Sequence, residues 1–182
     1  MSMTLLILGV ALWSAAHLFK RLAPDLRAGL GERAKGPITL ALVVALVLMV
    51  VGFRGADGAV FWGRSPAMAG INNLLMLASV YLFAAAGMKT AVARRLRHPM
   101  LWGVVLWSVG HLLVNGDTPS LILFGGMLLW ALAEMALINR AGPFVPPAAK
   151  PAKFEAMAVA GTLIVYGAAV GIHYALGYPT FG

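Results

Sequence analysis

Cysteine is absent from the chain, and acidic residues are scarce, since only 6 of the 182 residues are Asp or Glu. Without cysteine, disulfide bonds, thiolate metal sites and cysteine nucleophiles are excluded. Any metal ion or cofactor iron must therefore take its protein ligands from histidine, methionine, tyrosine or carboxylate side chains. With only 4 histidines, the chain offers few candidates for such a site.

Charged residues of both signs together make up only 11% of the chain, against about 25% in soluble domains. Hydrophobic residues make up 61%, and the mean hydropathy is +0.88. This composition excludes a soluble globular protein. It predicts an integral membrane protein whose main partner is the lipid bilayer.

Six apolar runs, each near the length that crosses a bilayer, divide the sequence. They predict an all-α, polytopic integral membrane protein with about six transmembrane helices in a single domain, residues 1–182. The second and fourth runs are the shortest, so the sequence leaves open whether one of them is buried without fully spanning. The runs are residues 3–19, 38–53, 69–88, 99–114, 121–138 and 154–176.

Basic residues are concentrated in alternate loops. The net charge is +8, and 12 of the 14 Lys and Arg residues lie in residues 20–35, 89–97 and 140–153. Basic loops mark the cytoplasmic side of a membrane protein. We therefore expect a protein of the bacterial inner (cytoplasmic) membrane with both termini periplasmic, and we attribute the charge to topology and not to nucleic acid.

A ten-residue pattern occurs twice, at residues 9–18 and 103–112, with seven positions identical, including one Trp and one His. The copies lie in the first and fourth predicted helices, so they run in opposite directions across the membrane. Inverted halves are typical of membrane proteins whose site lies near the midplane, where the halves meet. We therefore expect a 3+3 inverted repeat that builds one shared site.

The histidines of the two copies, His17 and His111, are the leading candidates for that site, because ionisable residues inside membrane helices are functional candidates. Their α-carbons are expected to differ in depth by roughly 13 Å, at 1.5 Å per residue. This separation is too large for one small metal ion and suits a haem iron bound between two histidines. The alternative is that each histidine is a structural residue, hydrogen-bonded between helices.

Several side chains share a helix face with these histidines, at spacings of three or four residues. The serine of each copy, or a backbone carbonyl, is expected to fix the imidazole tautomer and leave the other ring nitrogen for iron. The expected companions at the cofactor are Trp13, Trp107, Ser108 and Asn115.

Three further titratable residues, His98, His173 and Glu134, each have two possible roles. His98, beside Arg97 and just before the fourth predicted helix, is expected either to bind an anionic headgroup or polar substrate or to anchor the chain at the interface. His173 in the last predicted helix is the reserve second iron ligand, with an interfacial role as its alternative. We expect Glu134 to snorkel towards Arg140, with a proton relay as the alternative.

Four short motifs carry a resemblance to a known family. They are Arg97-His98-Pro99, Leu106-Trp107, His111-Leu112-Leu113-Val114-Asn115-Gly116-Asp117 and Leu123-Phe124-Gly125-Gly126. Together they closely resemble the motifs of the NnrU family of bacterial membrane proteins, a family named for an association with denitrification.

The resemblance implies specific chemistry, because the plant relatives of the NnrU family include 15-cis-zeta-carotene isomerase, a membrane enzyme with haem b. It implies haem ligation by His17 and His111. This chain has Ser108 where the plant enzyme has a cysteine, which puts ligand exchange through sulfur in doubt.

Two classes of function follow from these observations. The first is a haem-dependent enzyme, a redox-dependent cis–trans isomerase of a hydrophobic polyene or isoprenoid. The second is a non-catalytic accessory or assembly protein of a denitrification or respiratory complex, acting as a homo-oligomer or with a respiratory partner. A transporter ranks third, because no charge near the membrane centre offers a coupling site.

Overall fold

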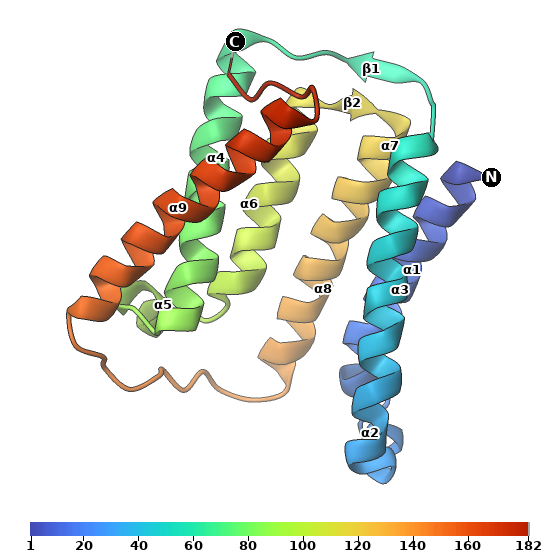
Figure 1. Ribbon diagram of the computed structural model, residues 1–182. Helices are drawn as coiled ribbons and strands as arrows, with labels where there is room; N and C mark the ends of the chain where they lie inside the picture. Colours follow the sequence, from blue (N-terminus) through green and yellow to red (C-terminus); the bar gives the residue numbers. More distant parts are fainter. Residues whose placement is uncertain (182) are drawn as a thin grey trace.

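The computed structural model describes residues 1–181 and shows a bundle of long helices joined by short connections (Figure 1). The long helices are α1 (Ser2–Leu22), α3 (Lys35–Gly55), α4 (Pro66–Met88), α6 (Pro99–Val114), α8 (Gly126–Arg140) and α9 (Lys153–Ala175). The connecting elements are α2 (Pro24–Leu30), η1 (Gly31–Ala34), β1 (Val60–Trp62), α5 (Ala91–Arg95), β2 (Gly116–Asp117), α7 (Thr118–Ser120) and η2 (Leu121–Gly125).

The helices confirm an all-α polytopic membrane protein. Within the described residues, 5 helical segments are long and apolar enough to cross a bilayer. The fourth predicted span is α6, a shorter apolar helix of 16 residues. The fifth span begins at Thr118 and continues without a break through α7, η2 and α8, so it is longer than its apolar run indicated.

The first basic segment differs from its expected loop structure. Residues 20–35 were expected to form a loop, but α1 continues to Leu22 and is followed by α2 and η1. Pro24 occupies the first turn of α2, where its missing N–H costs no hydrogen bond. The segment is therefore a helical connection and not an irregular loop.

The helices lie in a curved row, in the order α9, α4, α6, α8 and then the α1–α3 pair (Figure 1). The closest packing is within the α1–α3 pair and between α4 and α6. A Cβ at Gly9 would lie 2.8 Å from the backbone nitrogen of Met49, and one at Gly103 would lie 3.1 Å from the carbonyl oxygen of Ser79. The glycine shared by the two repeated segments thus permits close helix contact in both places.

The repeated segments run in opposite directions, as predicted. Figure 1 shows α1 descending from the N-terminus towards α2 and α6 rising towards β2. In the predicted 3+3 repeat, the counterpart of the contact between α1 and α3 is a contact between α6 and α8. These two helices do pack together. The pseudo-two-fold relation between complete halves stays a prediction.

The three basic segments meet at one end of the bundle, which we call the basic end. It contains α2, α5 and the α8–α9 connection, whereas the termini and the β1–β2 pair lie at the other end (Figure 1). The buried core between α1, α3, α6 and α8 is formed by Leu6, Met49, Val105, Met127, Trp130, Ala131 and Met135. Candidate site residues lie directly beside this core.

Candidate functional site: paired Trp–His motifs on the fifth span

The histidines of the two repeats make the same backbone contact. The distance from Nδ1 to the carbonyl oxygen four residues earlier is 3.0 Å for His17 and Trp13. It is 2.9 Å for His111 and Trp107. Because a carbonyl oxygen only accepts, Nδ1 carries the hydrogen in both, and Nε2 presents its lone pair. The backbone carbonyl, and not the serine, fixes the tautomer.

The two matching serines therefore have other environments. The Ser14 hydroxyl donates to the carbonyl of Val10 at 2.8 Å, so its hydrogen bond is made within its own helix. Ser108 is fully buried, and its hydroxyl has no partner within the described part of the chain. An unpaired hydroxyl in the helix of His111 marks a position where a polar group is unaccounted for.

The first Trp–His pair packs against Trp130 of α8. The ring centroids of Trp13 and His17 are 4.3 Å apart, and those of His17 and Trp130 are 4.8 Å apart. Trp13 also meets Trp130 edge to face, at 5.6 Å. Three aromatic rings thus join α1 to α8, with Trp130 only 7% exposed.

The second pair packs against Phe124, from the same transmembrane span. The rings of His111 and Phe124 are stacked at 4.5 Å with an interplanar angle of 23°. Trp107 lies 4.8 Å from Phe124 and 5.1 Å from His111. Phe124 belongs to η2, a π-helical turn, and such turns are frequent at functional sites.

The fifth span therefore forms a wall shared by both Trp–His pairs. Phe124 lies six residues before Trp130, which corresponds to about 9 Å along an α-helix. His111 meets the residue farther from the basic end, and His17 meets the residue nearer to it. This order agrees with the predicted difference in depth between the two histidines.

Sequence reasoning missed Phe124 and Trp130. Two features of the sequence could have indicated them: Trp130 is one of only 5 tryptophans, and Phe124 precedes a Gly-Gly pair. Their roles depend on which helices become neighbours, and the composition of a single helix does not reveal that.

A partly buried ion pair lies one turn beyond the first Trp–His pair. Arg21 Nε donates to Glu134 Oε1 at 3.3 Å, and Glu134 is 8% exposed. The expectation that Glu134 snorkels towards Arg140 was therefore wrong, because α1 brings a nearer guanidinium into the bundle. The indole N–H groups of Trp13 and Trp130 and Oε2 of Glu134 are buried without a partner among residues 1–181.

Asn115 and Asp117 organise the connection between α6 and α7. Asn115 Nδ2 donates to the carbonyl of His111 at 2.9 Å, which satisfies a C-terminal carbonyl of α6. Asp117 Oδ1 accepts from the Ser120 amide at 2.8 Å and so caps the next helix. A Cβ at Gly116 would lie 2.3 Å from the Trp62 ring, so the indole packs directly on this residue.

Arg97 and His98 both bind the C-terminal end of α8. Arg97 Nη2 donates to the carbonyls of Ile138, at 3.1 Å, and Gly142. The His98 Nε2 and Asn139 Oδ1 atoms are 2.9 Å apart. A cation at a helix C-terminus stabilises the helix, so Arg97 has a structural role, and the predicted headgroup or substrate contact stays a prediction.

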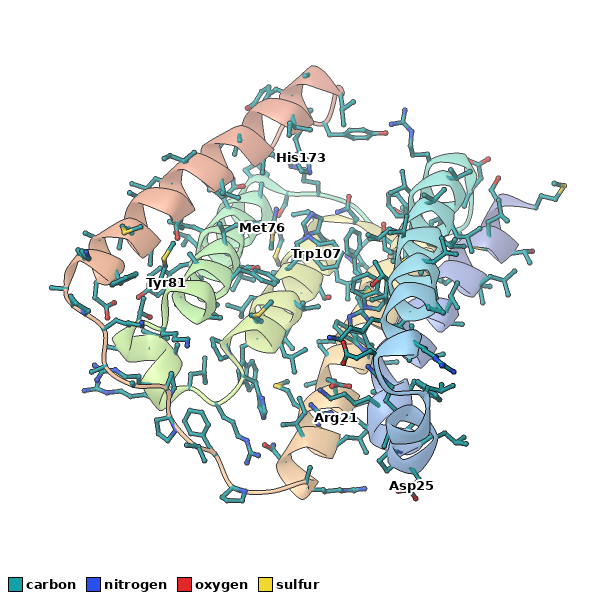
Figure 2. All side chains as sticks on the ribbon, turned by 60° about the horizontal axis from the view of Figure 1, so that its bottom comes forward. Arg21, Asp25, Met76, Tyr81, Trp107 and His173 are labelled. Atoms are coloured by element: carbon teal, nitrogen blue, oxygen red, sulfur yellow. The ribbon has the colours of Figure 1, made fainter. Side chains whose placement is uncertain are left out.

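His173 belongs to α9 and lies outside the two repeated segments of the sequence. Its Nδ1 is 2.8 Å from the carbonyl oxygen of Ala169, so it shares the backbone contact but has no tryptophan one turn earlier. Figure 2 shows its side chain leaving α9 on the side where Trp107 lies. Its role as the reserve iron ligand stays a prediction.

Conventional metal sites need a tighter cluster of ligands than the described residues provide. Among residues 1–181, no group of three or more His, Cys, Asp or Glu side chains is placed to hold a metal ion.

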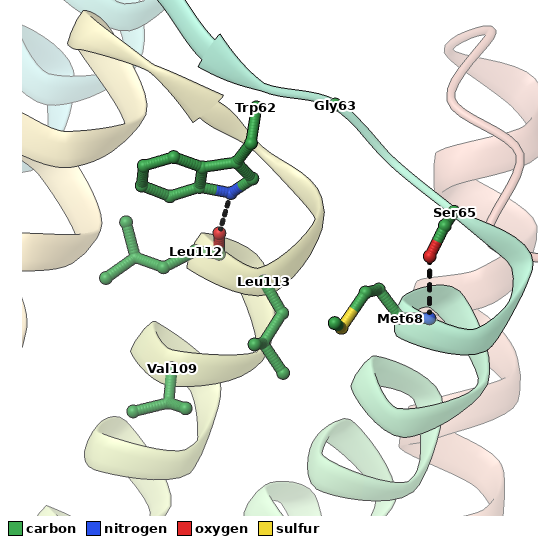
Figure 3. A pocket seen from close by; sticks show the side chains of 7 residues that line it. All are labelled: Trp62, Gly63, Ser65, Met68, Val109, Leu112 and Leu113. Atoms are coloured by element: carbon green, nitrogen blue, oxygen red, sulfur yellow. Dashed lines mark hydrogen bonds between the residues drawn. The ribbon is translucent and has the colours of Figure 1, made fainter.

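An apolar cavity of about 460 Å³ lies between α4 and α6, under Trp62 (Figure 3). Trp62 Nε1 donates to the carbonyl of Leu112 at 2.8 Å and fixes the indole over the cavity. The α6 residues that line it are Val109, Leu112 and Leu113, which lie roughly 100° to 160° round the helix from His111. The cavity therefore faces away from the Trp–His pairs.

The fold and the site define a polytopic helical membrane protein. Its two Trp–His pairs lie on oppositely directed helices, and both pack against the fifth span. The family model described as NnrU protein matches residues 5–180. The chain therefore belongs to the NnrU family. No curated protein and no solved structure matches it.

Proposed function

We propose that this NnrU-family protein binds haem b, with His17 and His111 as the side chains that would hold the iron. The observation that carries the proposal is the matched backbone contact of the two imidazoles, which places the hydrogen on Nδ1 in both. Nε2 is then the nitrogen with a lone pair for iron, as in many histidine sites where the other nitrogen is bonded to a carbonyl. A haem would need few ligands from the protein, which suits a chain with only 4 histidines and no cysteine.

The surroundings of the histidines suit an apolar, planar group. Trp13, Trp107, Phe124 and Trp130 supply aromatic surface beside the imidazoles, and this surface excludes water. The unpaired indole N–H groups of Trp13 and Trp130 and the buried hydroxyl of Ser108 offer hydrogen bonds to a polar edge. Bound haem would supply a redox-active iron inside the membrane.

The reaction that we propose is redox-dependent cis–trans isomerisation of a polyene or isoprenoid. This extension is supported by the resemblance of the motifs to plant 15-cis-zeta-carotene isomerase and by a site embedded among helices suited to lipid. A hydrophobic substrate reaches such a site from the bilayer. The chain's own contribution is to orient the imidazoles and to keep the site apolar.

A second candidate function is a non-catalytic accessory or assembly protein of a denitrification or respiratory complex. The observation that favours it is that each histidine ring already contacts an aromatic ring of the fifth span. In this case the Trp–His pairs are packing devices, and partners bind the outer surface of the bundle. For both candidates, we place the basic end in the cytoplasm and both termini in the periplasm of a bacterial inner membrane.

The absorption spectrum of the purified protein, expressed with added haem, separates the two candidates. We expect a Soret band and reduced-minus-oxidised features of haem b, and we expect His17→Ala and His111→Ala each to abolish or shift them. His98→Ala is the matched control, because that residue contacts Asn139 at the surface. His173→Ala tests the reserve ligand.

The proposal is wrong if the folded protein contains no haem, or if both histidine variants keep the original spectrum. If the His173→Ala variant alone loses the band, the iron is bound by a different pair of residues. Retention of a denitrification phenotype by both His17→Ala and His111→Ala would favour the accessory function.

A further inference from the structure

We propose that the α1–α3 hairpin binds an anionic phospholipid, with an acyl chain in an apolar groove and the phosphate on Arg33. The groove has a volume of about 490 Å³ and lies between α1 and the start of α3, closed by η1. This volume is within the range of small-molecule sites in proteins. The inference is independent of haem.

Small side chains create the groove. Ala15 and Ala16 of α1 face Ala34 and Ala41 from the second half of the hairpin. Since these side chains end at Cβ, two helices that pack closely elsewhere leave a slot at this point. An apolar slot at the membrane-facing side of a hairpin is filled by a lipid chain, because water has no hydrogen-bond partner there.

The groove is separate from the candidate haem site. Its residues Ala16 and Phe19 lie roughly 100° and 160° round α1 from His17. The histidine face of α1 packs on α8, whereas the groove opens on the flank shared with α3. A ligand in the groove therefore does not touch the imidazole.

The charge at the end of the groove selects an anionic headgroup. Arg21, Arg27 and Lys35 of this basic segment are already bonded to other protein groups. Arg33 lines the groove, is exposed, and makes no hydrogen bond or ion pair with the residues that the structure describes. Basic pockets between helices at this level of a membrane bind lipid phosphates, and a guanidinium suits phosphate oxygens.

Exposed leucines place this segment at the membrane surface. Leu22 at the end of α1 and Leu26 and Leu30 of α2 are 66%, 67% and 50% exposed. Exposed apolar side chains beside basic residues are typical of a segment that lies among lipid headgroups. Arg33 follows directly, so its guanidinium lies at the depth of the phosphates.

The test compares two lipids with identical acyl chains, phosphatidylglycerol and phosphatidylcholine, by native mass spectrometry of the full chain in detergent. We expect preferential binding of phosphatidylglycerol. Arg33→Gln is expected to weaken phosphatidylglycerol binding about fivefold, the effect of one basic residue at a lipid surface, and to leave phosphatidylcholine unchanged. Arg140→Gln, at an exposed position of the same end, is the matched control and is expected to have no effect.

A second variant tests the groove itself. Ala41→Trp fills the slot and is expected to weaken binding of both lipids. If it lowers the unfolding temperature, Ala15→Phe, at an exposed lining position, repeats the test. Equal binding of the two lipids, equal losses in the Arg33 and Arg140 variants, or unchanged binding after the groove is filled would each overturn the proposal.

Discussion

Arg21 on α1 and Glu134 on α8 form an ion pair inside the bundle, with Nε and Oε1 3.3 Å apart. It lies one turn beyond the contact of His17 with Trp130, because both helices advance by four residues between the two contacts. The aromatic contact and the ion pair therefore fix α1 and α8 in one register. Any function of His17 depends on this register.

Removing one partner of this pair is expected to destabilise the protein strongly. The side chains are 26% and 11% exposed for Arg21 and Glu134, and Glu134→Ala leaves a guanidinium without its counter-ion. A broken buried pair costs about 3–5 kcal/mol, and the partial exposure of Arg21 puts the expected loss near the lower figure. Thermal unfolding in detergent measures it.

The matched control for this prediction is Glu32→Ala. Glu32 forms a surface ion pair with Lys35, and its side chain is 83% exposed. An exposed pair contributes about 0–1 kcal/mol, so the unfolding temperature should barely change. The double variant Arg21→Met/Glu134→Leu should be more stable than Glu134→Ala, since it leaves no unpaired charge. Equal losses in Glu32→Ala and Glu134→Ala would contradict the structural role.

Trp130 should contribute more to stability than another tryptophan of the bundle. Trp130 is 7% exposed and contacts both rings of the first Trp–His pair, whereas Trp102 is 39% exposed. Truncating a buried tryptophan to alanine costs about 3–5 kcal/mol, and we expect less than about 1 kcal/mol for Trp102→Ala. Chemical denaturation of the two variants gives the comparison, and similar losses would show that α8 does not depend on this aromatic cluster.

The effect of a Gly→Ala substitution on stability should be negative at one position of the bundle and positive at another. Gly103→Ala places a methyl group 2.9 Å from the Phe83 ring and 3.1 Å from the Ser79 carbonyl oxygen, and such overpacking costs about 1–3 kcal/mol. Gly161→Ala in α9 meets nothing within 4 Å, and alanine gains roughly 0.5–1 kcal/mol over glycine within a helix. The unfolding temperature should therefore fall for the first variant and rise for the second. If both rise, α4 and α6 are not in close contact.

The sequence was sufficient to predict the class of fold and the membrane-spanning helices, because apolar length is a local property. It also placed the Trp–His pairs on oppositely directed helices. It did not predict that His17 and His111 pack on one shared span, since the choice of helix neighbours depends on contacts between distant residues. The prediction that Glu134 pairs with Arg140 was wrong for the same reason, because its actual partner, Arg21, lies 113 residues away along the chain.

The motifs that carried the family resemblance also have structural explanations that the sequence alone did not reveal. Arg97 and His98 bind the end of α8, and Asn115 bonds the end of α6. These contacts join helix termini that are close only in the folded chain. Their presence does not compete with the haem proposal, which depends on the imidazoles of His17 and His111.

Asp117 should be required as the cap of the helix that follows it. Its Oδ1 accepts from the Ser120 amide at 2.8 Å and its Oδ2 from the Ser120 hydroxyl at 3.0 Å, so the carboxylate starts the fifth span. Asp117→Ala is expected to cost about 0.5–2 kcal/mol, whereas Asp117→Asn keeps an acceptor for the amide and should cost less. Asp57→Ala, at an exposed position before β1, is the control and should be near neutral. Thermal unfolding ranks the three variants, and an Asn variant as unstable as the Ala variant would show that the charge, and not the cap, is what the fifth span requires.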